Sequence, residues 1–296
     1  MPPRCAASMP RVLALALALS SSFAWGVADF VAGLKSRSLP VASVMLVAVV
    51  TGLALAGAVV VARGAAPPAA SFLAYAALSA VVGSIGLAAL YRGLAVGAMS
   101  VVAPIAATGA AVPVAFGLAS GERPSAVQVV GAAIAIAGVV LAAREEESFA
   151  DSGRSARRKR LARGVPPAVL AAVGLGSFLV AIDAASEGDV GWAILVNRLV
   201  SLGLLTCAAV VLRPRPPASL RDAAPAVLVG VLETTANILI AIATTLGLVS
   251  LVGVLASLYP VVTIALARLV LGERIGRSQQ LGAGTALAGV VLIAAG

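Results

Sequence analysis

Ten apolar runs, each about as long as the hydrocarbon core of a bilayer requires, divide this chain. A helix needs ~20 apolar residues to cross that core. The runs are 12 to 33, 40 to 62, 70 to 91, 97 to 119, 124 to 143, 166 to 186, 190 to 212, 223 to 245, 248 to 270 and 278 to 295. The pattern predicts an all-α integral membrane protein with ten transmembrane helices, a multi-pass protein of the cytoplasmic membrane.

Composition excludes an ordinary water-soluble enzyme. Of the 296 residues, 61% are hydrophobic and 11% are charged, whereas a soluble domain has about 25% charged residues. The net charge of +9 comes from cations in the loops, which fits orientation in a lipid bilayer better than binding to nucleic acid. Histidine is absent, and Cys5 and Cys207 are far apart, so zinc sites and His-dependent catalysis lack their residues. We expect no metal and no cofactor.

The first run has two interpretations. Arg4 and Arg11, followed by an apolar stretch and Ser22-Phe23-Ala24, also fit a cleaved signal peptide. The apolar stretch continues past Ala24 to Gly33, and the segment has a counterpart later in the chain. These two features favour a retained transmembrane helix.

An internal repeat organises the chain. Residues 121 to 141, GERPSAVQVVGAAIAIAGVVL, align without gaps on 272 to 292, GERIGRSQQLGAGTALAGVVL, at an offset of 151. The sequence therefore predicts two domains of five spans each, 1 to 143 and 166 to 296. Between them, residues 144 to 165 have separate acidic and basic halves, which predict a disordered linker. An odd number of spans per half places the second half upside down in the membrane, an architecture of many secondary transporters.

These residues are similar to a known family. Two five-helix halves, each with a Gly-Glu-Arg turn followed by Gln, Gly and a Gly-Val-Val-Leu run, resemble the EamA domains of the drug/metabolite transporter superfamily. Tyr259-Pro260 also fits the ninth span of that family, whereas Gly109 replaces the matching proline of the first half. The resemblance implies export or exchange of small metabolites or drugs through a central cavity, without a bound cofactor.

The repeated residues are expected to be scaffold. Gly131 and Gly138, and likewise Gly282 and Gly289, are seven positions apart and share a helix face. Such small residues allow close packing of helices within one chain, or between the chains of a homodimer. Glu122 with Arg123, and Glu273 with Arg274, lie at span ends and are expected to form turns and interface anchors.

Polar residues inside the spans are candidates for binding a small-molecule substrate. Glu233 lies midway along the eighth span, and Asn237 and Thr244 lie within about 40° of it on the helix. A charge at the centre of a bilayer costs at least ~2.5–3.5 kcal/mol, so it tends to line a cavity or to find a partner. Glu233 could bind an ammonium group or carry a coupling proton. Its structural alternative is an ion pair with Arg198.

Further candidates lie in other spans. Asn197 and Arg198 are about a third of the way into the seventh span, where Arg198 could grip a carboxylate or phosphate or extend to the headgroups. Trp25 and Asp29 share a face of the first span, and Asp29 could instead be a solvated charge near its end. Tyr259 precedes Pro260, which kinks the ninth span, and broken helices of transporters often lie at the binding site.

These features favour a secondary transporter that works by alternating access. A channel or a structural membrane protein is the alternative, but the polar residues are not repeated between the halves: Glu233 corresponds to Gly83 and Asn237 to Leu87. An intramembrane enzyme is less favoured, because the sequence has no histidine, no Gly-x-Ser-x-Gly motif and no paired acids at helical spacing within a span. The chain is therefore not expected to be an enzyme.

Two arguments give opposite orientations of the chain in the membrane. Odd-numbered loops hold 15 Lys and Arg residues, against 4 in the N-terminus and the even-numbered loops. Because cytoplasmic loops are enriched in these residues, the count places both termini outside. The family resemblance implies that both termini lie in the cytoplasm.

Overall fold

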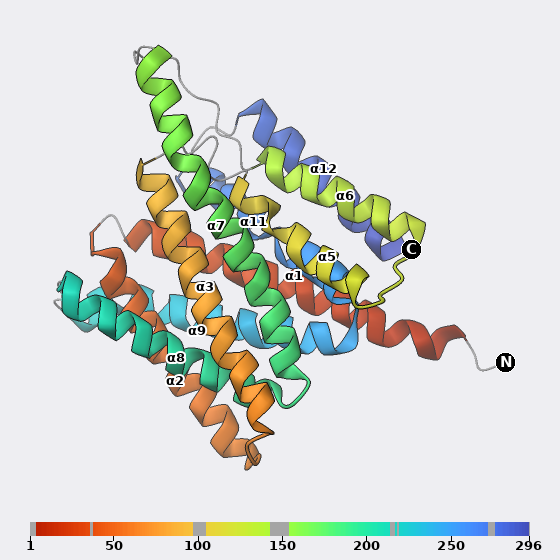
Figure 1. Cartoon of the computed structure of the whole chain (residues 1–296), viewed down its shortest axis with the longest axis horizontal. Helices are drawn as coiled ribbons and strands as arrows, with labels where there is room; N and C mark the ends of the chain where they lie inside the picture. Colours follow the sequence, from red (N-terminus) through yellow and green to blue (C-terminus); the bar gives the residue numbers. More distant parts are fainter. Residues whose placement is uncertain are drawn as a thin grey trace. The chain divides into compact units, whose positions relative to one another are not determined.

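The computed structural model describes residues 4–35, 38–96, 105–142, 154–213, 217, 219–271 and 276–295 (Figure 1). All regular structure in these ranges is helical. The elements are α1 (Arg4–Lys35), α2 (Val41–Arg63), α3 (Ala70–Val96), η1 (Thr108–Ala110), α5 (Ala111–Ala119), α6 (Ala126–Ala142), α7 (Arg154–Ser186), α8 (Val190–Leu212), α9 (Leu220–Leu246), α10 (Val249–Ala256), α11 (Tyr259–Leu271) and α12 (Arg277–Ala295).

The helices confirm an all-α membrane protein. Within the described ranges, seven helical stretches are long and apolar enough to cross a membrane. Shorter apolar stretches cover Ile105–Ala119, Ala126–Ala142 and Val249–Thr263. Each of the ten apolar runs in the sequence overlaps one of these stretches. The chain is therefore a multi-pass membrane protein.

The helices form two compact units. Unit 1 comprises Met1–Val81 and Ala181–Gly247, and unit 2 comprises Val82–Val180 and Leu248–Gly296. Unit 1 thus contains α1, α2, α8 and α9, and unit 2 contains α5, α6, α10, α11 and α12. Each unit takes helices from both halves of the sequence. The repeat describes similarity along the chain, whereas the compact units describe which helices pack together.

Small residues bring α1, α2 and α9 together in unit 1. Ala28, Ala48 and Val229, one from each helix, are buried in one core cluster. The Ser21 hydroxyl donates a hydrogen bond of 2.8 Å to the carbonyl oxygen of Ala236. Helix α1 thus packs along α9 through small side chains and one buried hydrogen bond.

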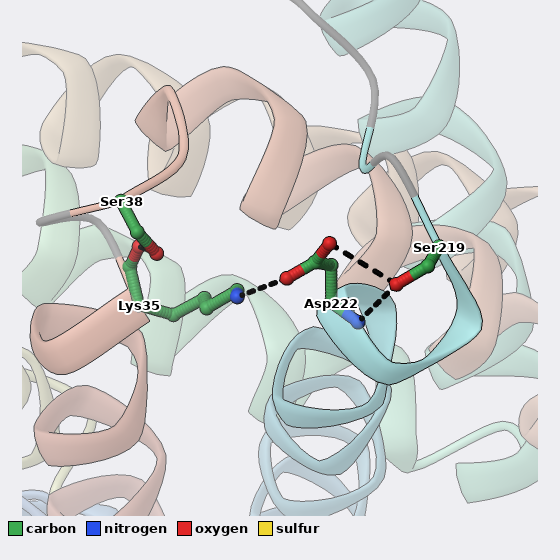
Figure 2. Close-up of polar contacts among 4 residues, drawn as sticks. All are labelled: Lys35, Ser38, Ser219 and Asp222. Carbon is green, nitrogen blue, oxygen red and sulfur yellow. Dashed lines mark hydrogen bonds and ion pairs between the residues drawn. The ribbon is translucent and has the colours of Figure 1, made fainter.

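Ion pairs connect helix ends at two places in unit 1. At the end of α1, Lys35 Nζ lies 3.2 Å from Asp222 Oδ1, and the Ser219 hydroxyl accepts a hydrogen bond from the Asp222 amide at the start of α9 (Figure 2). At the end of α2, Arg63 Nη2 lies 2.9 Å from Asp189 Oδ2, directly before α8. Exposed pairs contribute only about 0–1 kcal/mol each, so their main effect is to set helix register.

Glycines allow α6 and α12 to touch along their backbones in unit 2, where the two helices run side by side (Figure 1). A Cβ atom at Gly131 would lie 2.9 Å from the carbonyl oxygen of Gly289, and one at Gly138 would lie 2.8 Å from that of Gly282. Residue numbers rise along one helix as they fall along the other, so the pair is antiparallel. These glycines therefore pack helices within the chain, and their shared face is not free for a homodimer.

The Gly-Glu-Arg turn at the end of α5 caps another helix. Glu122 Oε1 accepts a hydrogen bond of 2.6 Å from the Val249 amide, and Oε2 accepts one of 3.2 Å from the Ser250 amide, at the start of α10. Gly121 has a φ of 92°, which favours glycine. A side chain at Gly117 would overlap the Glu122 carboxylate. Glu122 thus satisfies amides that the start of α10 leaves free.

Part of the predicted linker is helical. Residues 154–165 continue α7, so the expectation of a disordered linker is wrong for this half. Arg, Lys, Ala and Leu, which fill this stretch, are strong helix formers. Residues 143–153 lie outside the described ranges, as do Glu273 and Arg274 of the second turn.

The apolar runs predicted as the fourth and ninth spans depart from a regular α-helix at corresponding places. In the ninth, α10 ends at Ala256, and α11 begins at Tyr259 with Pro260 in its first turn. In the fourth, the 3₁₀ turn η1 precedes α5, and the offset of 151 maps residue 108 onto residue 259. A Cβ atom at Gly109, inside η1, would lie 2.6 Å from the carbonyl oxygen of Ala172. This glycine therefore allows the broken span to approach α7 where the matching proline is missing.

Candidate functional site

Helix α9 carries the polar stripe that the sequence predicts. It begins at the Ser219 cap and ends before Gly247. Glu233 is half-buried, whereas Asn237 and Thr244 are buried. The Thr244 hydroxyl donates to the carbonyl oxygen of Ala241 in its own helix, at 3.1 Å. The Thr244 hydroxyl proton is therefore used within its own helix.

Glu233 forms an ion pair with Arg198 of α8. Arg198 Nη1 donates to Glu233 Oε2 at 3.4 Å. The Arg198 side chain is 7% exposed and that of Glu233 is 33% exposed. The structural alternative for Glu233 is thus present, whereas extension of Arg198 to the headgroups is wrong, because the guanidinium is buried against a carboxylate. A pair inside helices of an apolar span is costly to desolvate, which favours a functional role.

Asn197 faces a different neighbour. Its Nδ2 donates a hydrogen bond of 2.8 Å to the Ser79 hydroxyl of α3, and this hydroxyl donates to the carbonyl oxygen of Ala76 at 2.7 Å. All three residues are buried. The network ties α8 to α3 and gives the side-chain amide nitrogen of Asn197 a hydrogen-bond partner. Asn197 is therefore held by a hydrogen bond to α3.

Two residues that the sequence did not single out lie beside Arg198. Thr234 is fully buried, and its hydroxyl has no hydrogen-bond partner among the described residues. A Cβ atom at Gly52 of α2 would lie 3.3 Å from Arg198 Nε and would overlap the Thr234 hydroxyl. Thr234 follows Glu233 directly in the sequence, which is a usable signal. Gly52 is one of 30 glycines, and nothing in the sequence distinguishes it.

Helix α1 contributes a second carboxylate. Asp29 is exposed, and it lies close enough to Glu233 for the two charges to repel each other. Trp25, one turn earlier, is half-buried. Ser22 and Ala18, which share the Asp29 face of the helix, are buried. Asp29 therefore lies at the exposed end of a helix face whose earlier turns are buried.

Tyr259 belongs to unit 2. It is half-buried at the start of α11, directly after the turn that separates α10 from α11, and its carbonyl oxygen accepts a hydrogen bond of 3.1 Å from the Thr263 hydroxyl. The predicted residues of α1, α8 and α9 lie in unit 1. In the described ranges, no three acidic or thiol side chains come together as a metal site.

Comparison with known proteins relates the second half of the chain to a family. The sequence profile of the EamA-like transporter family matches residues 162–295. This segment, which is less than half of the chain, is similar to that family. For the matched segment, this likeness indicates a membrane transporter of the drug/metabolite type. A search of the curated proteins finds no match.

The fold is shared with solved structures. One crystal structure superposes with a TM-score of 0.75 and covers 95% of this chain and 96% of its own, at 17% sequence identity. At this identity the likeness concerns the fold alone. It extends over nearly the whole chain, whereas the EamA-like match covers the second half.

Proposed function

We propose that the chain is a secondary transporter that moves small metabolites or drugs across the cytoplasmic membrane by alternating access. One observation carries the proposal: within unit 1 of an EamA-like fold, Arg198 and Glu233 meet inside apolar helices, with Asp29 nearby. Charged groups at such depth face the bundle interior or a water-filled pathway and mark substrate or ion routes. Glu233 and Asp29 supply negative charge for a cation or a coupling proton.

Helix packing supports an inverted repeat of ten spans. The offset of 151 maps Gly131 onto Gly282 and Gly138 onto Gly289. Under this mapping, the contact between Gly131 and Gly289 corresponds to the contact between Gly282 and Gly138. Two equivalent helices related in this way must be antiparallel, as an axis in the membrane plane requires. The broken fourth and ninth spans fit the same relation.

Transport is tested in proteoliposomes. The purified chain is reconstituted and loaded with a defined mixture of small metabolites and cationic drugs, and efflux is followed by mass spectrometry. We expect saturable efflux of at least one compound, accelerated by unlabelled compound on the opposite side, as an exchanger or carrier requires. Protein-free liposomes are the control. Non-saturating flux indicates a channel, chemical conversion indicates an enzyme, and no flux of any compound contradicts the proposal.

Topology tests the ten-span arrangement separately. Reporter fusions after Ser155 and after Gly296 should report opposite sides of the membrane, because five spans separate these positions. At each position, one fusion carries alkaline phosphatase and another carries green fluorescent protein. These two reporters are active on opposite sides of the membrane, so each position is read twice. Two fusions on the same side would contradict ten spans. The same data decide between the orientation from the Lys and Arg count and the one that the family implies.

A further inference from the structure

Arg198 uses only part of its hydrogen-bonding capacity. Its Nη1 donates to Glu233, whereas its Nε and Nη2 are buried without a partner among the described residues. Nε and Nη2 form one edge of the planar guanidinium. Such an edge matches the two oxygens of a carboxylate or phosphate in a bidentate pair. The free edge is therefore the part of Arg198 suited to recognising an oxyanion.

A third donor points to the same place. The Thr234 hydroxyl is fully buried and unpartnered, and it lies against the position where Gly52 lacks a side chain. Arg198 Nε lies 3.3 Å from that same position. The Thr234 hydroxyl and Arg198 Nε thus both lie against α2 at Gly52, where they occupy the space that a Cβ atom would need.

Unpaired donors at this depth are unfavourable. A buried polar group without a partner costs more than a hydrogen bond contributes, and more still when it is charged. Glu233 neutralises Arg198 but occupies only Nη1. Asp29, which lies near Glu233, is a further acidic group that would repel an anion. A ligand that supplies two oxygens to the free edge would remove the cost.

We propose that the Nε and Nη2 edge of Arg198 and the Thr234 hydroxyl form a subsite for an oxyanion, a carboxylate or phosphate group, on the transported solute. Glu233 holds Arg198 in place from the opposite side of the guanidinium. The proposal rests on the proposed transport function and specifies its substrate class. Because the donors are covered by protein in this structure, the anion reaches them when the helices around Gly52 move apart, as alternating access requires.

Binding is tested on the full-length chain in phospholipid-free detergent. Thermal melting is measured against increasing inorganic phosphate, and separately acetate, with chloride keeping the ionic strength constant. We expect a saturable rise in melting temperature for the wild type with at least one of the two anions. Thr234→Val should need an at least about tenfold higher concentration, and Arg198→Lys, which keeps the charge but loses the bidentate edge, should lose the saturable rise.

Matched variants separate binding from general salt effects, since phosphate stabilises many proteins by exclusion from their surface. Thr234→Ser keeps the hydroxyl and should respond like the wild type. Gly52→Ala should block the subsite, whereas Gly57→Ala, on the same helix with only Leu195 Cδ1 at 3.9 Å, should not. If Arg198→Lys does not fold, two comparisons still test the subsite: Thr234→Val with Thr234→Ser, and Gly52→Ala with Gly57→Ala. An equal response in all variants, or none in the wild type, overturns the subsite.

Two further outcomes separate this subsite from the transport proposal. Saturable flux restricted to solutes without a carboxylate or phosphate rejects the subsite and leaves the transporter intact. Variant-dependent anion binding without any flux supports the subsite and rejects the transporter. Addition of vesicles with anionic lipids distinguishes the source: a rise in melting temperature with vesicles, but none with phosphate or acetate, would assign the donors to a lipid headgroup and overturn a solute subsite.

Discussion

Gly282→Ala should sharply destabilise the chain, whereas Gly284→Ala should leave it as stable as the wild type or slightly more stable. A Cβ atom at Gly282 would overlap the backbone amide of Ala142 on α6, and a backbone atom cannot turn aside as a flexible side chain can. At Gly284 nothing lies within 4 Å of a Cβ atom. Overpacking costs about 1–3 kcal/mol or more, and here we expect the upper end.

The comparison is controlled because both changes add one methyl group to the same helix. Each replaces glycine by alanine in α12, so each gains the same helix propensity of about 1 kcal/mol. Melting temperature and the yield of monodisperse protein in detergent give the readout. Equal melting of the two variants would show that α6 and α12 are not in backbone contact, and it would remove the main packing support for the inverted repeat.

The sequence predicted the transmembrane character and the repeat because these depend on local patterns. Runs of apolar residues mark spans wherever they occur, and polar identities such as Gln128 with Gln279 are hard to obtain by chance in a low-complexity background. The compact units could not be predicted in this way. Val81 and Ala181 join one unit although a hundred residues separate them, because long-range packing determines which helices meet.

Part of the candidate site could also be predicted from local sequence patterns. Glu233 and Arg198 stand out because charge inside a span is expensive, and their pairing was foreseen as an alternative. Gly52 and Thr234 did not stand out. Glycine and threonine are ordinary in transmembrane helices, and only the meeting of α2, α8 and α9 gives these two residues their position next to the guanidinium.

Glu233→Gln should abolish coupled transport while leaving the fold intact. Glutamine has the same shape, and its amide oxygen can still accept the hydrogen bond from Arg198 Nη1, now 3.4 Å from Glu233 Oε2. The variant loses the charge that would bind a cation or exchange a proton. Since only interactions that differ between states of the cycle drive transport, loss of this charge should reduce flux at least about tenfold, while melting stays close to that of the wild type.

Glu187→Gln is the matched control, because Glu187 is exposed in the turn between α7 and α8 and should change neither property. Flux and melting are measured side by side on the same preparations. Removing one partner of a fully buried pair costs about 3–5 kcal/mol. The partial exposure of Glu233 and the remaining hydrogen bond should keep the loss well below that. If both the melting temperature and the flux of Glu233→Gln fall, Glu233 serves stability. If the flux is unchanged, its charge has no role in transport.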